Sequence, residues 1–308
     1  MGTSSAVPVL TLTYSGFLNG DDQSAIVAPF ASVNADANSG IGVYPITLTG
    51  GVAANYNLTL INGQLTIGKA ILTITADDKA FEYGGEVPAL TLTYQGFTNG
   101  DDKSSIVPPQ VATSVQSKSN IGSYEISLAG GASAKYDIRL VPGTMTVNPA
   151  SLTIKADDKN LTYGETVPAF TSTITGLVSG DEALLANLNY VTSIGTTPNA
   201  GIYSITPVGV TATNYDLSMV IGTLILAMAV LTVTTNDLSI TYGEDVPTST
   251  LSYSGFVNGD TKSDIIEPTA ITTANGSNAG SYPIILIGGI ATNYNIISSD
   301  ATLTIGKS

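Results

Sequence analysis

The stretch ILTITADDKAFEYGGEVPALTLTYQGFTNGDD, residues 71–102, is the best guide to the fold, because the chain repeats it with small changes at a step of 79–80 residues. The most regular marker is a Val-Pro pair, found at Val7-Pro8, Val87-Pro88, Val167-Pro168 and Val246-Pro247. Two tyrosine positions keep the same step, at Tyr44, Tyr124, Tyr203 and Tyr282, and at Tyr56, Tyr136, Tyr215 and Tyr294. A fixed period of this kind indicates an array of like structural units. We therefore predict four domains, repeats 1 to 4, at residues 1–70, 71–150, 151–229 and 230–308.

Repeat 2 carries the pattern of a mainly β domain. Residues 90–94 alternate apolar and polar side chains with a period of two, as a half-buried strand does. The same reasoning predicts strands at 71–75, 111–115, 122–128, 136–140 and 143–147, with the last two as a closing pair. The Asn99-Gly100 turn leads into Asp101 and Asp102, either of which can cap a short helix. The fold class is thus a tandem array of four β-grasp-like or sandwich-like domains, each with one short helix.

The junctions between repeats are very short. They fall at Lys69-Ala70, Pro149-Ala150 and Met228-Ala229, and no Gly/Ser-rich or Pro-rich linker separates the repeats. We therefore expect restricted hinges and an elongated rod of very roughly 120 Å, taking about 30 Å for each domain.

Repeat 1 has no counterpart of the first predicted strand of the other repeats. Val7 aligns with Val87, so this chain has no residues equivalent to 71–80. The missing strand predicts an open sheet edge near residues 10–14, and such an edge can pair with another chain.

Composition excludes several functional classes. Among 308 residues there are 24 acidic and 10 basic side chains, giving a net charge of −14, and there is no Cys or His. Nucleic acid and anionic membrane surfaces are poor partners, because both need clustered Lys and Arg. The lack of Cys and His removes disulfides, thiolate nucleophiles, the commonest acid–base residue and the commonest transition-metal ligand.

One apolar run, MVIGTLILAMAVLTV at residues 219–233, is long enough to raise the question of a membrane helix. The repeat register answers it: Gly222 falls where Gly143 falls one repeat earlier, and Leu231 where Leu152 falls. The run therefore predicts two strands with a junction between them, and no membrane insertion.

The succession Leu-Thr-Ile-Thr-Ala, Tyr-Gly, Val-Pro, Gly-Phe-x-Asn-Gly-Asp, Gly-x-Tyr and Asn-Tyr-x-Leu resembles the YGX-type repeats known as MBG domains. The Tyr-Gly pair stands at Tyr83-Gly84, Tyr163-Gly164 and Tyr242-Gly243. The resemblance covers essentially the whole chain. It implies a tandem array from a large bacterial surface or adhesin-like protein, located at the cell surface. No signal peptide is visible, so we expect a fragment with flanking domains as its partners.

Two recurring residue types could carry a binding function. Fourteen of the 15 Tyr residues fall in four repeat columns, where they either form sugar-stacking platforms or pack each core with their hydroxyls bonded at the rim. Recurrence in every repeat favours packing. The acidic pairs, Asp21-Asp22, Asp77-Asp78, Asp101-Asp102, Asp157-Asp158 and Asp181-Glu182, could bind Ca²⁺, but no D-x-D-x-D-G loop accompanies them. Capping and turn roles explain them more simply.

The sequence assigns no catalytic, cofactor-binding or metal-ligating residue. A Ser/His/Asp triad is impossible without His, and no glycine-rich phosphate loop opens a helix. We expect a non-enzymatic, extracellular structural stalk that spaces a distal domain from the cell. Two alternatives stay open: a multivalent array that binds a glycan or a host or neighbour-cell protein, and a filament-forming surface subunit.

Overall fold

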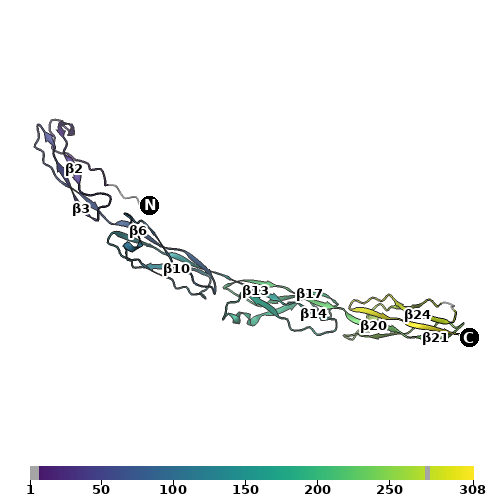
Figure 1. The fold of residues 1–308 in the computed structure, drawn as a ribbon. Helices are drawn as coiled ribbons and strands as arrows, with labels where there is room; N and C mark the ends of the chain where they lie inside the picture. Colours follow the sequence, from purple (N-terminus) through teal and green to yellow (C-terminus); the bar gives the residue numbers. More distant parts are fainter. Residues whose placement is uncertain (1–6, 275–277) are drawn as a thin grey trace. The chain divides into compact units, whose positions relative to one another are not determined.

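The computed structural model describes residues 7–274 and 278–308 of the chain (Figure 1). The chain divides into two compact units, Met1–Pro149 and Ala150–Ser308, and we describe each unit by itself. Unit 1 holds repeats 1 and 2, and unit 2 holds repeats 3 and 4. Strands dominate every repeat, so the prediction of a mainly β tandem array is confirmed.

Repeat 2 consists of two sheets. The three-stranded sheet has the order β11 (Tyr136–Val141), β6 (Ala70–Ala76), β8 (Leu92–Gln95). The four-stranded sheet has the order β7 (Lys79–Glu82), β12 (Gly143–Asn148), β10 (Gly122–Ala129), β9 (Gln110–Ala112). Within each sheet one pair is parallel, β6 with β11 and β7 with β12. The chain passes between the two sheets five times, and the short connections from β6 to β7 and from β11 to β12 are two of these crossings.

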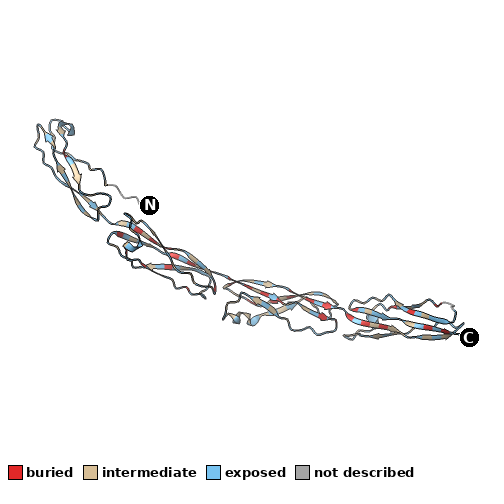
Figure 2. Ribbon diagram, viewed as in Figure 1, coloured by how far each residue is buried: buried red, intermediate tan, exposed pale blue. Residues whose placement is uncertain are grey.

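The core of repeat 2 follows from the period-two pattern of its strands. Leu72 and Ile74 of β6 and Met145 and Val147 of β12 are buried, while the residues between them face outward. Figure 2 shows these buried positions alternating along the central strands. Side chains of successive strand residues point to opposite faces, so alternation alone supplies one apolar face to each sheet.

Two predicted details of repeat 2 are wrong. The closing pair of residues 136–140 and 143–147 does not exist, because β11 pairs with β6 and β12 pairs with β10 and β7. Pro142 lies between β11 and β12, where the chain passes from one sheet to the other. Strand β7 is also absent from the predicted strands. That strand is only four residues long, too short for its alternation to stand out in the sequence. It is identified by its parallel pairing with β12.

Repeats 3 and 4 have the same topology. In repeat 3 the strands are β13 (Ala150–Ala156), β14 (Lys159–Thr162), β15 (Ser172–Thr175), β16 (Asn189–Thr192), β17 (Gly201–Val208), β18 (Tyr215–Val220) and β19 (Gly222–Ala227). In repeat 4 they are β20 (Ala229–Thr235), β21 (Leu238–Thr241), β22 (Leu251–Ser254), β23 (Thr269–Thr272), β24 (Gly280–Ile287), β25 (Tyr294–Ser299) and β26 (Ala301–Gly306). The sheet orders are β15-β13-β18 with β14-β19-β17-β16, and β22-β20-β25 with β21-β26-β24-β23.

The apolar run at residues 219–233 forms strands, as predicted. It covers the end of β18, all of β19 and the start of β20, and Met228 is the single residue between β19 and β20. Within the described residues, no helix has the length and apolarity that crossing a bilayer would require.

Repeat 1 is less complete. Its strands are β1 (Ile26–Val27), β2 (Phe30–Val33), β3 (Gly42–Thr49), β4 (Val52–Ala53) and β5 (Gly63–Ile67), in the sheets β2-β3-β5 and β1-β4. The predicted edge strand at residues 10–14 is wrong: these residues belong to no strand, because their counterpart β8 pairs with β6 and repeat 1 has no β6 equivalent. Among the described residues, β5 has one strand neighbour, β3, whereas its counterpart β12 has two, β10 and β7.

Each predicted helix is a single 3₁₀ segment: η1 (Gln23–Ala25), η2 (Lys103–Ser105), η3 (Glu182–Asn187) and η4 (Lys262–Asp264). The turn before η2 is an Asn-Gly pair with left-handed backbone at both residues, φ 55° at Asn99 and 76° at Gly100. Asparagine and glycine are the residues that tolerate this conformation best. The turn places Asp101 and Asp102 side by side with different tasks, described below.

We expect repeat 1 to be the least stable part of the chain. Between residues 7 and 69 the only buried residue is Pro29, whereas repeats 2 to 4 each bury several Leu, Ile or Val side chains. With little apolar area removed from water, backbone amides of residues 7–70 should exchange with solvent faster than those of residues 230–308 in a monomeric sample. Equal protection of the two segments in hydrogen exchange would contradict this prediction.

Candidate functional site

The most regular polar feature is a tyrosine hydroxyl bound to an aspartate at one end of each repeat. In repeat 2 the Tyr136 hydroxyl donates to Asp101 Oδ2 at 2.9 Å and accepts from the Thr98 backbone N–H at 3.0 Å. The pairs Tyr56–Asp21, Tyr215–Asp181 and Tyr294–Asp260 make the same contact. We call this contact the Tyr–Asp lock. It ties the first residue of β11, β18 or β25 to the turn before the 3₁₀ helix.

The ring of each lock tyrosine packs beside a phenylalanine in repeats 1, 2 and 4. Phe17–Tyr56, Phe97–Tyr136 and Phe256–Tyr294 are edge-to-face pairs with ring centroids 5.4–5.5 Å apart. Tyr136 is 2% exposed, and its ring belongs to the same core cluster as Leu72 and Ile74. The prediction that this column packs the core with its hydroxyls bonded is therefore confirmed for repeat 2, and Tyr215 and Tyr294 are buried likewise.

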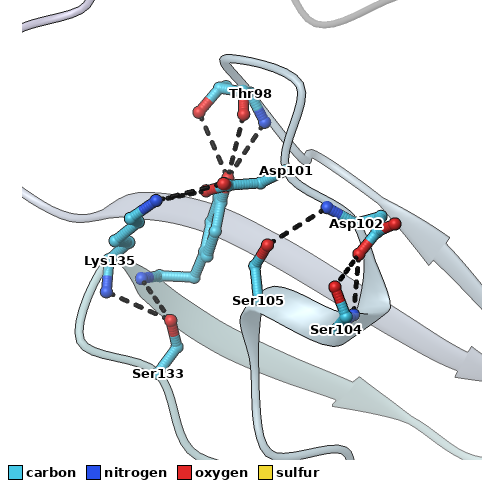
Figure 3. A network of polar contacts seen from close by, with 8 residues as sticks. Thr98, Asp101, Asp102, Ser104, Ser105, Ser133 and Lys135 are labelled. Atoms are coloured by element: carbon cyan, nitrogen blue, oxygen red, sulfur yellow. Dashed lines mark hydrogen bonds and ion pairs between the residues drawn. The ribbon is translucent and has the colours of Figure 1, made fainter.

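In Asp21-Asp22 and in Asp101-Asp102 the two members of the acidic pair make different hydrogen bonds. In Asp101-Asp102 the first residue holds the lock, while Asp102 Oδ1 accepts from the Ser104 backbone N–H at 2.8 Å and caps η2. Figure 3 shows both residues, with Lys135 bonded to Asp101 at 3.0 Å. In repeat 4 Asp260 keeps the lock and Thr261 takes over the cap. Repeat 4 has Thr261 in place of the second acidic residue, yet it keeps both the lock and the cap.

The other acidic pair stands where the chain crosses between sheets. Asp77 accepts from the hydroxyls of Thr91 and Thr93, and Asp78 Oδ1 accepts from the Thr144 backbone N–H at 2.7 Å. Asp157 and Asp158 repeat these contacts in repeat 3. In repeat 4 Asn236 bonds Thr250 and Asp237 bonds Thr302. These carboxylates therefore serve structural hydrogen bonds.

Hydrogen bonding shifts the pKa values of several of these groups. The pKa of Asp101 lies below its ordinary value because Lys135 and Tyr136 donate to it. Thr91 and Thr93 lower the pKa of Asp77, and their counterparts lower that of Asp157. Burial, with a contribution from Asp260, raises the pKa of Tyr294 to about 12. The contribution of the Tyr294 hydroxyl to the lock in repeat 4 is therefore retained up to about pH 10 and is lost as Tyr294 ionises towards pH 12.

A second tyrosine column braces the loop before the long central strand. The hydroxyls of Tyr44, Tyr124, Tyr203 and Tyr282 each donate to the backbone carbonyl four residues upstream, at 2.6–2.8 Å. These side chains are half-buried, so their rings cover the sheet while their hydroxyls reach the rim. The assignment to packing is confirmed for this column as well.

The third column, Tyr83, Tyr163 and Tyr242, has a different role. Within unit 2 the Tyr163 hydroxyl donates to Asp260 Oδ2 of repeat 4 at 2.9 Å, so Asp260 accepts from two tyrosines. The rings of Tyr163 and Tyr294 pack edge to face with centroids 5.6 Å apart. Tyr163 is 9% exposed, but its counterpart Tyr242 is 51% exposed. For Tyr242 the prediction of a core role is wrong. Repeat 4 covers the ring of Tyr163, but no described residue covers the ring of Tyr242.

Side-chain amides of asparagine make further contacts between repeats 3 and 4, and we call the whole set of contacts the joint. Asn293 Oδ1 accepts from the Ala200 backbone N–H at 2.8 Å, and its Nδ2 donates to Asn199 Oδ1 at 3.2 Å. Gly164 approaches Val257 so closely that a Cβ at this position would lie 2.6 Å from Val257 Cγ2. The apolar core is also continuous across the joint, since Tyr163, Ala229 and Tyr294 belong to one cluster. We define the joint as these contacts of Tyr163, Gly164, Asn199 and Ala200 with Val257, Asp260, Asn293 and Tyr294.

The tyrosines and aspartates of the joint are among the residues singled out from the sequence, whereas its asparagines and the role of Gly164 are not. The signal was present, because Asn precedes the lock tyrosine at Asn55, Asn214 and Asn293, and Asn-Ala precedes the central strand at Asn199-Ala200 and Asn278-Ala279. A cleft of about 700 Å³ beside the joint is lined by Tyr163, Asn199, Asp260 and Asn293, among others. Among the described residues, no group of three or more Asp or Glu side chains is placed to hold a metal ion.

The comparison with protein families gives this architecture its identity. The family model of the MBG domain (YGX type) matches the chain four times, at residues 2–66, 72–146, 152–225 and 231–304. These matches cover nearly the whole chain. The protein therefore belongs to the MBG (YGX-type) family and is a tandem array of four such domains, as the resemblance of its motifs implied.

Other comparisons are distant. No curated protein matches this chain at a significant level. Among solved structures, the chain is similar to the Drosophila N-cadherin EC1-4 region, with 8% identity, a TM-score of 0.24, and 86% of this chain and 83% of that one covered. It is also similar to the three N-terminal domains of the bacteriophage RB49 highly immunogenic outer capsid protein (Hoc), with 10% identity, a TM-score of 0.21, and 91% and 98% covered.

Removing a lock tyrosine should unfold its own repeat first. We expect Tyr136→Ala and Tyr215→Ala each to lower the free energy of unfolding by roughly 3–5 kcal/mol, because a large buried ring is lost. Tyr136→Phe keeps the ring and removes the hydroxyl, so its cost should be nearer 1–2 kcal/mol. Chemical denaturation measures both. Wild-type stability in either alanine variant would mean that this column does not pack the core.

Gly164→Ala should weaken the joint, and Gly243→Ala is its matched control. Both glycines have left-handed backbone, φ 96° and 99°, so both substitutions cost about 1 kcal/mol in backbone strain. Only at position 164 does the added methyl collide with Val257, because a Cβ at Gly243 meets nothing within 4 Å. We expect a clearly larger loss of melting temperature for Gly164→Ala. Equal losses in the two variants would indicate that the contact with Val257 is not tightly packed.

Chelation should leave the fold unchanged. The acidic pairs are engaged in lock, cap and turn hydrogen bonds, which leaves few carboxylate oxygens for the six to eight ligands of Ca²⁺. We expect the same melting temperature in EDTA and in excess Ca²⁺. A bound structural Ca²⁺ would raise stability by several kcal/mol at saturation, so a fall of many degrees in EDTA that Ca²⁺ reverses would overturn this assignment.

Proposed function

We propose that this array is a non-enzymatic stalk that sets the distance between other parts of an extracellular, bacterial, adhesin-like surface protein. In this role the repeats hold other domains at a fixed distance and bind no substrate. Flanking domains of the same protein are the partners that the proposal requires, and MBG repeats in tandem are typical of such proteins.

The observation that carries the proposal is the joint between repeats 3 and 4. A spacer has to resist bending, and bending at a domain boundary is the default unless the interface is well packed. Here a single residue, Met228, separates two strands, and a shared carboxylate, Asp260, holds one tyrosine from each repeat. Such charge-assisted hydrogen bonds are directional, so they oppose rotation of one repeat against the other.

The alternative of a glycan-binding array has less support. A repeated sugar platform would need the same exposed aromatic side chain in each repeat. Among the described residues, the exposed aromatic side chains are Phe30 and Tyr242, and these occupy different positions in the repeat. The remaining rings are used in cores, in locks and at the joint. An enzymatic role is likewise disfavoured, because the recurring carboxylates are occupied by structural hydrogen bonds.

The acidic surface fits the proposed location. A net charge of −14 with few charged residues favours solubility without strong attraction to anionic lipids or nucleic acid. A stalk gains from such a surface because it should not adhere along its length.

The proposal is tested by measuring reach and stiffness. Small-angle scattering of the whole chain should give a maximum dimension of roughly 120 Å, and a compact globule would contradict the proposal. For the joint, the absence of native Cys allows spin labels at Ser218→Cys and Ser298→Cys, both on exposed positions of repeats 3 and 4. Pulsed electron resonance should give one narrow distance distribution. Tyr163→Ala should broaden it, whereas Tyr242→Ala, the matched control, should not.

A further inference from the structure

In repeats 2, 3 and 4 the chain enters and leaves through one pair of long, parallel strands. Repeat 3 serves as the example, because another repeat lies on each side of it in the sequence. Asp157 and Asp158 alone separate β13 from β14, and Ile221 alone separates β18 from β19. β13 pairs with β18 over six residue pairs, and β14 pairs with β19 over four, all in parallel register. We call β13 and β14 together the entry strand, and β18 and β19 together the exit strand.

A side-chain hydrogen bond joins the entry and exit strands where both change sheets. Asp158 Oδ1 accepts from the Thr223 backbone N–H at 2.7 Å, between the end of the first parallel ladder and the start of the second. Repeats 2 and 4 make the corresponding bonds, Asp78 with Thr144 and Asp237 with Thr302. Their parallel ladders also have six and four residue pairs. The two strands are therefore connected along almost their whole length in each of these repeats.

The register places the entrance and the exit of the repeat at opposite ends of this strand pair. Ala150 lies opposite Tyr215 where both strands begin, and Thr162 lies opposite Ala227 where both end. Because the strands run in the same direction, the chain enters at Ala150 and leaves at the other end, at Ala227. Tension along the chain therefore slides one strand along the other. Sliding stretches the hydrogen bonds between the strands together, whereas peeling from one end breaks them one after another.

The two strands that receive the tension are held on both sides. β13 lies between β15 and β18, and β19 lies between β14 and β17. Leu152 and Ile154 of β13 and Leu224 of β19 are fully buried, so sliding would also expose apolar side chains to water. Residues 163–214 lie between the entry and exit strands in the sequence, and the direct path of the tension bypasses them.

We propose a further function for repeats 2, 3 and 4: each is a clamp that carries tension from its entry strand to its exit strand. Forced unfolding is governed by the rate of crossing the unfolding barrier, and bonds that must break together raise that barrier. The use of the clamp rests on the proposed stalk function, because a stalk is pulled when the parts that it joins move apart. The clamp itself is a property of a single repeat.

Pulling repeat 3 in two directions tests the proposal. Ser151→Cys with Ala227→Cys makes the strands slide, because these exposed positions lie near the entrance and at the exit. Ser151→Cys with Asp216→Cys makes the same strands peel, because these exposed residues are opposite each other in the register. Both double variants are made in the full chain, which has no Cys of its own, and DNA handles on the thiols are held in optical tweezers. Thermal melts should show equal stability of the two variants.

At the same constant force, the Ser151–Ala227 variant should unfold at least about tenfold more slowly than the Ser151–Asp216 variant, since one or two more net hydrogen bonds break at the barrier. Repeat 2 offers the same comparison if a repeat 3 variant does not fold: Ile71 with Asn148 for sliding, and Ile71 with Asp137 for peeling.

Equal unfolding rates in the two directions, or faster unfolding by sliding, would overturn the proposal. This outcome is separate from the test of the stalk, because only one repeat lies between the handles. A compact array in scattering would contradict the stalk and leave the comparison of pulling directions unchanged.

Discussion

A buried phenol needs a hydrogen-bond partner, and in this protein that need organises every repeat. The ring of Tyr136 supplies apolar area to the core, while its hydroxyl is held by Asp101 and by the backbone of Thr98. Because the tyrosine begins one strand and the aspartate precedes the 3₁₀ segment, one contact fixes the relative position of two parts of the chain that are far apart in sequence. The same contact appears in all four repeats, with an acidic partner at 2.9 Å or less.

The joint extends this arrangement from one repeat to the next. Asp260 holds Tyr294 of its own repeat and also accepts from Tyr163 of the preceding one, so a structural bond inside a domain becomes a bond between domains. Burial raises the pKa of Tyr294 to about 12, so its hydroxyl remains able to donate at a higher pH than an ordinary phenol could. The lock and the joint therefore depend on the same carboxylate. A substitution of Asp260 would remove a hydrogen bond from a tyrosine of each repeat in unit 2.

Repeat 1 separates the contribution of the lock from that of the central strand. It retains the Tyr56–Asp21 lock and the antiparallel sheet of β2, β3 and β5, yet between residues 7 and 69 it buries only Pro29. In the other repeats, the strand equivalent to β6 contributes Leu and Ile or Val to the centre and pairs with two neighbours. The lock therefore positions chain segments, whereas the central strand supplies the apolar area that stabilises them.

Four features of this protein are predictable from the amino-acid sequence alone: the number of repeats, the mainly β class, the strand character of residues 219–233 and the packing role of two tyrosine columns. Each of these rests on local periodicity or on recurrence at a fixed step, which a single chain displays without folding. Three other features became visible only in the folded chain: β11 and β12 lie in different sheets, β7 exists, and Asp101 and Asp102 make different hydrogen bonds. The tertiary structure also showed that Tyr163 belongs to a joint while Tyr242, at the same position of the repeat, is exposed. Parallel pairing and contacts between repeats join residues distant in sequence, so their partners are chosen by packing in three dimensions and leave only faint local patterns.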